Sequence, residues 1–173
     1  MSVIDERVRD ILRVKFLVGI FDNPYQTDYE AADEEVDGEQ NNKVALRASL
    51  ESLVLLKNAD SDSPFATDGK TLPLNAGALR RVAVIGPNAD DTGYANLHYG
   101  PLGTENVSVL KGLRNALEGK AEVVYAKGCE LVDKIWPESE ILPTDPDEEE
   151  LAGIAEAVKA AESSDVAVLV LGG

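Results

Sequence analysis

The side chains best suited to chemistry follow an apolar segment in the middle of the chain. The run Arg81–Gly86 is rich in β-branched residues and apolar after Arg81, and Asn88, Asp90 and Asp91 follow it closely. In an open parallel sheet, ligands bind at the carboxyl ends of the strands. Amide and carboxylate groups at such a place can bond the hydroxyl groups of a ligand. From local sequence alone, the simpler interpretation is that Asn88 and Asp90 bond the backbone of their own turn.

Three aromatic residues stand in the loop after this turn, namely Tyr94, His98 and Tyr99. Aromatic faces stack on sugar rings and on bases, but they also pack in cores. His98 is the only histidine of the chain, and its sequence neighbours offer no catalytic partner. A structural role for His98 is therefore the simpler interpretation. Together with Asp90, these three residues are the candidates for substrate binding.

The sequence argues against cofactor and metal sites. Gly86 is followed by proline and acids, not by the G-x-G-x-x-G fingerprint, and the acids would repel a phosphate. With one histidine and one cysteine, the chain can form neither a multi-histidine nor a cysteine-rich metal site. The acids between positions 145 and 150 suit the start of a helix better than a calcium site. We therefore expect no cofactor and no metal ion.

Composition narrows the range of partners. The 173 residues include 16 Lys plus Arg against 32 Asp plus Glu, a formal charge of −16 at pH 7. This charge disfavours binding to nucleic acid or to an anionic membrane surface. The longest apolar run, 166–171, is far shorter than the roughly 20 residues of a membrane span. Apolar residues make up 44% of the chain, enough for a buried core.

The second half of the chain alternates between two kinds of pattern. Runs that are apolar after their first residue, at 81–86, 122–126 and 165–171, predict buried strands, and helical spacing at 108–117 and 147–161 predicts helices, with Ser108 as an N-cap. This order predicts the α/β class, with a partial parallel sheet and helices on both faces.

The first half predicts separate elements. Residues 2–21 have the apolar spacing of an amphipathic helix, and Gly19 is a suitable end for it. Residues 22–42 carry acids and no base, which indicates a solvated linker or a loop over the surface. Helical spacing resumes at 43–50, and the run 53–56 predicts a short buried strand or a helix end.

Six segments resemble, in order, parts of family 3 of the glycoside hydrolases. They are Val8–Phe16 with Gly19–Tyr25, Glu51–Asn58 with Leu72–Leu74, Arg81–Asp90, Val107–Leu113, Tyr125–Cys129 and Asp165–Gly172. The resemblance implies three parts: 1–21 is the last helix of a barrel domain, 22–42 is an acidic interdomain linker, and 43–173 is the N-terminal half of an α/β sandwich domain.

The resemblance also implies an activity. Enzymes of this family release β-linked glucose or xylose from non-reducing ends by a retaining mechanism. Their nucleophilic aspartate and their acid/base glutamate are expected outside this chain, so no catalytic residue is assigned and the chain alone is expected to be inactive. Tyr94 or Tyr99 is expected to line the subsite for the leaving group, although Asn96–Tyr99 departs from the usual family pattern.

The end of the sequence favours a piece of a longer protein, because a buried strand normally leads into a covering helix. Exposed apolar surface and an open sheet edge then predict a homo-oligomer.

Two alternatives to a part of a glycoside hydrolase remain. One is a non-catalytic carbohydrate-binding or interaction module of α/β fold. The other is a small flavodoxin-like or nucleotide-binding domain, which the absent phosphate loop disfavours.

Overall fold

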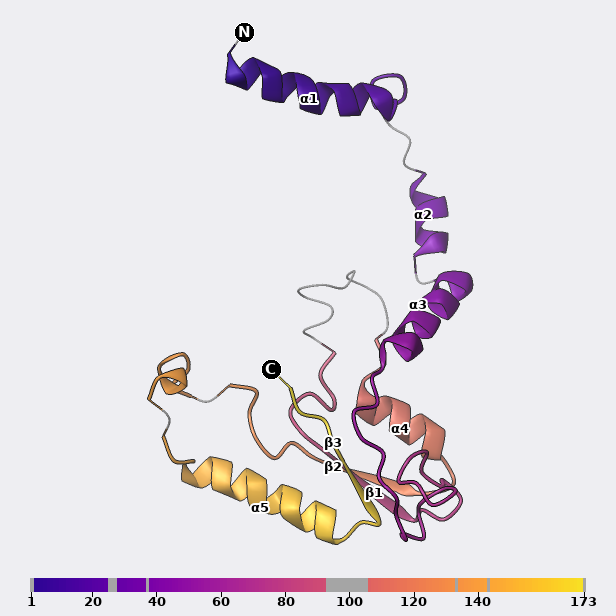
Figure 1. The fold of residues 1–173 in the computed structure, drawn as a ribbon, viewed down its shortest axis with the longest axis vertical. Helices are drawn as coiled ribbons and strands as arrows, with labels where there is room; N and C mark the ends of the chain where they lie inside the picture. Colours follow the sequence, from indigo (N-terminus) through magenta and orange to yellow (C-terminus); the bar gives the residue numbers. More distant parts are fainter. Residues whose placement is uncertain are drawn as a thin grey trace. The chain divides into compact units, whose positions relative to one another are not determined.

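The computed structural model describes residues 2–24, 28–36, 38–92, 106–132, 134–142 and 144–172 (Figure 1). The chain divides into two compact units, Met1–Leu53 and Val54–Gly173. The first unit contains the helices α1 (Val3–Leu17), α2 (Tyr29–Glu35) and α3 (Glu39–Ser52). The second contains, in chain order, β1 (Arg81–Ile85), α4 (Val109–Leu117), β2 (Glu122–Ala126), the short 3-10 helix η2 (Glu138–Glu140), α5 (Glu148–Glu162) and β3 (Val166–Leu169).

Helix α1 has well-formed ends. Ser2 and Asp5 form a capping box, in which each side chain accepts a hydrogen bond from the other residue's backbone N–H. At the other end, Gly19 adopts φ +75°, and Ile20 N–H donates to the carbonyl of Lys15. This is the Schellman arrangement that glycine permits. The predicted stop at Gly19 is confirmed, and no described residue of α1 is buried within the structure.

The acidic segment 22–42 is less irregular than the sequence predicts. It contains α2 and the start of α3. Asp28 caps α2 by accepting a hydrogen bond from Ala31 N–H, and Glu30 lies in the first turn, where the helix dipole favours an acid. The acids therefore support a short helix here, which charge counting alone did not reveal.

The expectation of a short buried strand at 53–56 is wrong. Leu53 is the C-cap of α3, and the following residues have neither helical nor strand structure. Leu56 is 93% exposed. An apolar run forms a strand only where another strand offers backbone partners, and the described residues pair none with this one.

The sheet of the second unit has the strand order β2-β1-β3, and both neighbours of β1 are parallel to it. Successive side chains of β1 point to opposite faces. Val82 and Val84 pack with Leu110 and Leu117 of α4, whereas Ala83 and Ile85 pack in a second cluster of buried residues. Ala157 of α5 belongs to that second cluster. Helices therefore cover both faces, which confirms the predicted α/β class.

Strand β3 is shorter and more exposed than predicted. It spans Val166–Leu169, and its side chains alternate between half-buried and exposed. Leu169 and Leu171 are each 63% exposed. The cause is position: within the described residues β3 pairs with β1 alone, so it is an edge strand.

The amino ends of β1 and β3 are joined by one carboxylate. Asp165 Oδ2 accepts hydrogen bonds from the backbone N–H groups of Arg80 and Arg81, at 2.7 and 3.0 Å. These bonds stabilise the charged form and hold the pKa of Asp165 below its ordinary value. Asp165 thereby sets where β3 begins relative to β1.

Candidate functional site

The strand order predicts where a ligand would bind at this sheet. From the central strand β1, the chain passes through α4 to β2 on one side, and later through α5 to β3 on the other side. In such sheets, the switch point outside the carboxyl ends of the strands is where ligands bind. Here that point lies beyond the ends of β1 and β3, where the turn 86–90 and the segment 170–172 are located.

These two segments are in direct contact. Gly86 has φ +133°, and a Cβ added to it would lie 2.8 Å from the carbonyl carbon of Val170. Only glycine therefore fits this close approach. Val170 N–H donates to Ile85 O at 2.7 Å, and Asn88 Nδ2 donates to Gly172 O at 2.9 Å. The turn after β1 and the chain leaving β3 form one connected edge.

The same turn is also attached to α4. Leu110 N–H donates to the carbonyl of Ala89 at 2.9 Å, and Ala89 is fully buried. Ser108 Oγ donates to Asp90 Oδ1 at 2.8 Å, while Asp90 itself is exposed. Asn88 and Asp90 therefore each bond a residue outside their own turn.

Tyr125, on β2, adds a hydroxyl group to this edge. Its oxygen lies 3.5 Å from the carbonyl oxygen of Gly86, at the outer limit of a hydrogen bond. Burial raises the pKa of Tyr125; Lys127 acts in the opposite direction, and the negative charges of Asp90 and Glu130 raise the pKa further. The phenol therefore stays neutral at physiological pH and remains a hydrogen-bond donor.

Of the four predicted substrate-binding residues, the structure describes Asp90 alone. Tyr94, His98 and Tyr99 lie outside the described residues. Sequence reasoning identified Ser108 as a helix cap but not as the partner of Asp90, and it assigned no role at this edge to Tyr125. The signal for both was the parallel order itself, which brings the ends of β1 and β2 and the start of α4 to one side of the sheet.

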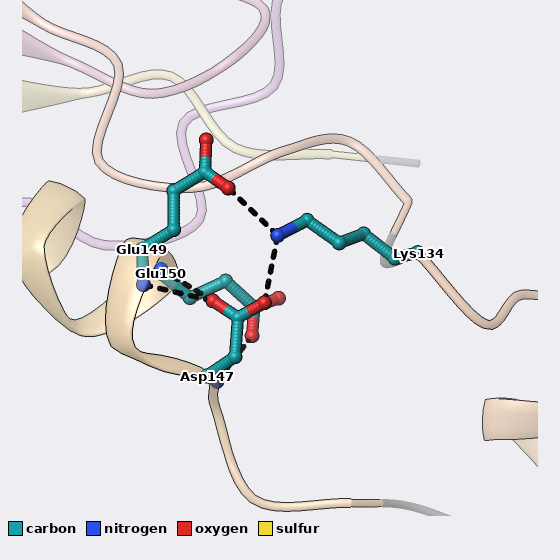
Figure 2. Close-up of polar contacts among 4 residues, drawn as sticks. All are labelled: Lys134, Asp147, Glu149 and Glu150. Carbon is teal, nitrogen blue, oxygen red and sulfur yellow. Dashed lines mark hydrogen bonds and ion pairs between the residues drawn. The ribbon is translucent and has the colours of Figure 1, made fainter.

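A second polar group fastens the loop after β2 to α5 (Figure 2). Lys134 Nζ lies 2.7 Å from Asp147 Oδ2 and 2.7 Å from Glu149 Oε2. Asp147 also accepts hydrogen bonds from the backbone N–H groups of Glu149 and Glu150, each at 2.9 Å, and so caps α5. These contacts raise the pKa of Lys134 and lower that of Asp147.

The ion pairs of Lys134 and the capping bonds of Asp147 account for the acidic run around 145–150. These capping and ion-pair contacts support the predicted helix start. Two hollows of about 350 and 280 Å³ share Lys134 and Glu150 in their linings.

Among the residues that the structure describes, no cluster of three potential metal ligands is present, and no helix is long and apolar enough to span a membrane.

A sequence model described as "Glycosyl hydrolase family 3 C-terminal domain" matches residues 53–173, well over half of the chain. The chain belongs to glycosyl hydrolase family 3. The resemblance inferred from the six segments is thereby confirmed.

Relatives of this family 3 chain carry names of two activities. A periplasmic beta-glucosidase of Salmonella typhimurium is 33% identical over 99% of this chain and 22% of its own length. A beta-xylosidase of Formosa agariphila is 32% identical over 99% of this chain and 21% of its own length. The chain thus spans about a fifth of the length of these relatives.

Solved structures agree with the fold of the family 3 chain. A β-glucosidase from Erythrobacter marinus matches with a TM-score of 0.69 and 32% identity, over 94% of this chain and 21% of that one. A β-glucosidase involved in saponin metabolism from intestinal bacteria matches with a TM-score of 0.67 and 27% identity, over 98% of this chain and 24% of that one. The part of each enzyme that matches this chain has the α/β fold that the alternating strands and helices predict.

Proposed function

We propose that this chain forms part of the second domain of a retaining, exo-acting glycoside hydrolase that releases β-linked glucose or xylose. In this proposal, 1–21 is the last helix of a barrel domain, 22–42 is the interdomain linker and 43–173 is the first half of the α/β sandwich. The observation that carries the proposal is the extent of similarity: nearly the whole chain aligns with about a fifth of a beta-glucosidase and of a beta-xylosidase.

The isolated chain is expected to be inactive. Retaining hydrolysis needs a nucleophilic carboxylate and an acid/base carboxyl group about 5 Å apart. From the resemblance to family 3, we expect both of these groups to lie outside the 173 residues. What this chain contributes is a wall of the active site, not the reacting groups.

The wall that we propose is the carboxyl edge of the sheet. Asp90 would accept a hydrogen bond from a sugar hydroxyl, and Tyr94, His98 and Tyr99 would line the subsite for the leaving group. The exposed position of Asp90 at the β1 turn, next to the switch point, supports this assignment. Because carboxylate groups repel anions, the edge suits neutral sugars.

The first test is an activity assay of the purified chain with nitrophenyl β-glucoside and nitrophenyl β-xyloside. A complete β-glucosidase of family 3 serves as the positive control. We expect no release of nitrophenol above the buffer rate. Turnover that persists at constant specific activity through repurification would contradict the proposal.

Calorimetry with glucose, xylose and short oligosaccharides distinguishes the hydrolase part from a self-sufficient carbohydrate-binding module. A wall lacking the rest of its active site is expected to bind these sugars more weakly than the millimolar range. Millimolar or tighter binding would favour the module.

We also propose that the isolated chain self-associates. In α1, Ile4 and Phe16 are 74% and 65% exposed, and in the second unit Leu169 and Leu171 lie exposed at the edge strand. Exposed apolar groups and an unpaired strand edge favour association. Light scattering coupled to gel filtration is expected to give a mass above that of one chain. A monomer at high protein concentration would contradict this.

A further inference from the structure

Ser108 is the only polar residue of the described part of the chain that is buried, with 8% of its surface exposed. It is the N-cap of α4, and its hydroxyl oxygen accepts a hydrogen bond from Lys111 N–H at 3.1 Å. The same hydroxyl donates its proton to Asp90 Oδ1 at 2.8 Å. One buried hydroxyl thus links the start of α4 to the exposed carboxylate of the β1 turn.

The two bonds of this hydroxyl constrain each other. A serine has a single hydroxyl proton, and the accepted N–H occupies one side of the oxygen. The proton is therefore directed to the remaining acceptor, Asp90, and a bond to a charged acceptor is stronger than one between neutral groups. The backbone is held at the same place, because Leu110 N–H donates to Ala89 O.

We propose that Ser108 is a positioning residue for Asp90, so that its hydroxyl fixes the carboxylate for contact with a substrate hydroxyl. The substrate part of this inference rests on the proposed function. Ser108 engages Oδ1, which leaves Oδ2 as the oxygen presented to a ligand. A group held in place before binding loses less conformational entropy when the ligand arrives.

Three substitutions separate positioning from helix capping. Ser108→Thr keeps a hydroxyl that can both accept and donate. Ser108→Asp keeps a strong N-cap acceptor but has no proton to donate at neutral pH, and its charge repels Asp90. Ser108→Ala removes both functions. Thermal unfolding and the exchange rate of the Lys111 amide report capping in each variant.

Positioning has two readouts of its own, both by NMR on the full chain. The first is the rotamer of Asp90 from side-chain couplings. The second is the titration of the Tyr125 ring in the wild type, Ser108→Ala, Ser108→Thr and Asp90→Asn. Tyr125 reports the place of the Asp90 charge, and Lys127 and Glu130, which also act on it, are the same in every variant compared.

We expect Asp90 to occupy one rotamer in the wild type and in Ser108→Thr, and to average over several in Ser108→Asp and Ser108→Ala. The Asp90 charge raises the pKa of Tyr125, so Asp90→Asn should lower that pKa. In Ser108→Ala, where Asp90 is no longer held in place, the pKa of Tyr125 is expected to fall as well. In Ser108→Asp, the Lys111 amide is expected to stay protected although Asp90 is released.

An unchanged single rotamer of Asp90 in Ser108→Asp, or in a folded Ser108→Ala, would overturn the inference and leave Ser108 as a helix cap only. These readouts do not depend on hydrolysis. Turnover by the isolated chain would refute the proposed function without altering the rotamer of Asp90, so the two failures can be told apart.

Discussion

Replacing Gly86 with alanine should separate β3 from β1. The new Cβ would lie 2.8 Å from the Val170 carbonyl carbon, whereas ordinary contacts begin at 3.4 Å. The strands would have to part by more than half an ångström, which weakens the 2.7 Å hydrogen bond from Val170 N–H to Ile85 O. That bond contributes about 1 kcal/mol. Placing a side chain at φ +133° adds about 1–3 kcal/mol of strain. We expect Gly86→Ala to lose about 2–4 kcal/mol.

Gly119→Ala is the matched control. Gly119 also has a positive φ, +70°, but a Cβ there would meet no atom within 4 Å. The free energy of unfolding of Gly119→Ala should therefore fall only by the strain of the positive φ, about 1 kcal/mol. Urea unfolding followed by circular dichroism measures both variants, and with m about 1–3 kcal/mol/M the midpoint of Gly86→Ala should fall by about 1–2 M. Equal midpoints for the two variants would refute the close approach of β1 and β3.

Three further substitutions test other contacts by the same urea method. Leu110→Ala removes a side chain that is 1% exposed between α4 and the sheet, and should cost about 2–5 kcal/mol; a loss below 1 kcal/mol would contradict the packing. Gly112→Ala lies within α4, where a Cβ would make only an ordinary 3.7 Å contact, and should stabilise by about 0.5–1 kcal/mol; destabilisation would show the site to be tighter. Asp165→Asn should weaken the pH dependence of stability. Because the pKa of Asp165 is lower in the folded state, its contribution is present above the ordinary value of 3.8 and is lost as pH falls through the folded-state value. Wild type and variant should therefore differ more at pH 7 than at pH 3, and a constant difference would refute the role of the bonds from Arg80 and Arg81.

The sheet and its two helices could be predicted because their signals are local. The run at β2 is apolar from Val123 to Ala126, and the strand found is the one predicted, Glu122–Ala126. The N-cap of α4 is Ser108, as the sequence indicated. In each case a few neighbouring residues contain the whole signal, and helix caps and β-branched runs act over such short distances.

The contacts that shape the candidate site were not predictable in this way. Asn88 bonds a carbonyl 84 positions later, and Asp90 bonds Ser108 across 18 positions. The first bond depends on β3 lying next to β1, and the sequence does not state strand order. The second depends on how the start of α4 packs beside the β1 turn. The exposure of β3 was missed for the same reason, because the composition of an edge strand and of a central one can be alike.

The central place of β1 has a consequence for how the protein is made. β1 pairs with β2 across a separation of 41 positions and with β3 across 84, as the register pairs Arg81 with Glu122 and Val82 with Val166 show. Shorter chain closures cost less entropy, so the β1–α4–β2 unit should form first. On the ribosome, the roughly 40 residues from the end of β2 to the end of β3 take about 2–9 s to synthesise at about 5–20 residues per second. During that interval, one side of the nascent β1 lacks its partner β3. Binding by a chaperone, or wrong pairing with another nascent chain on the same messenger RNA, would then compete with correct folding.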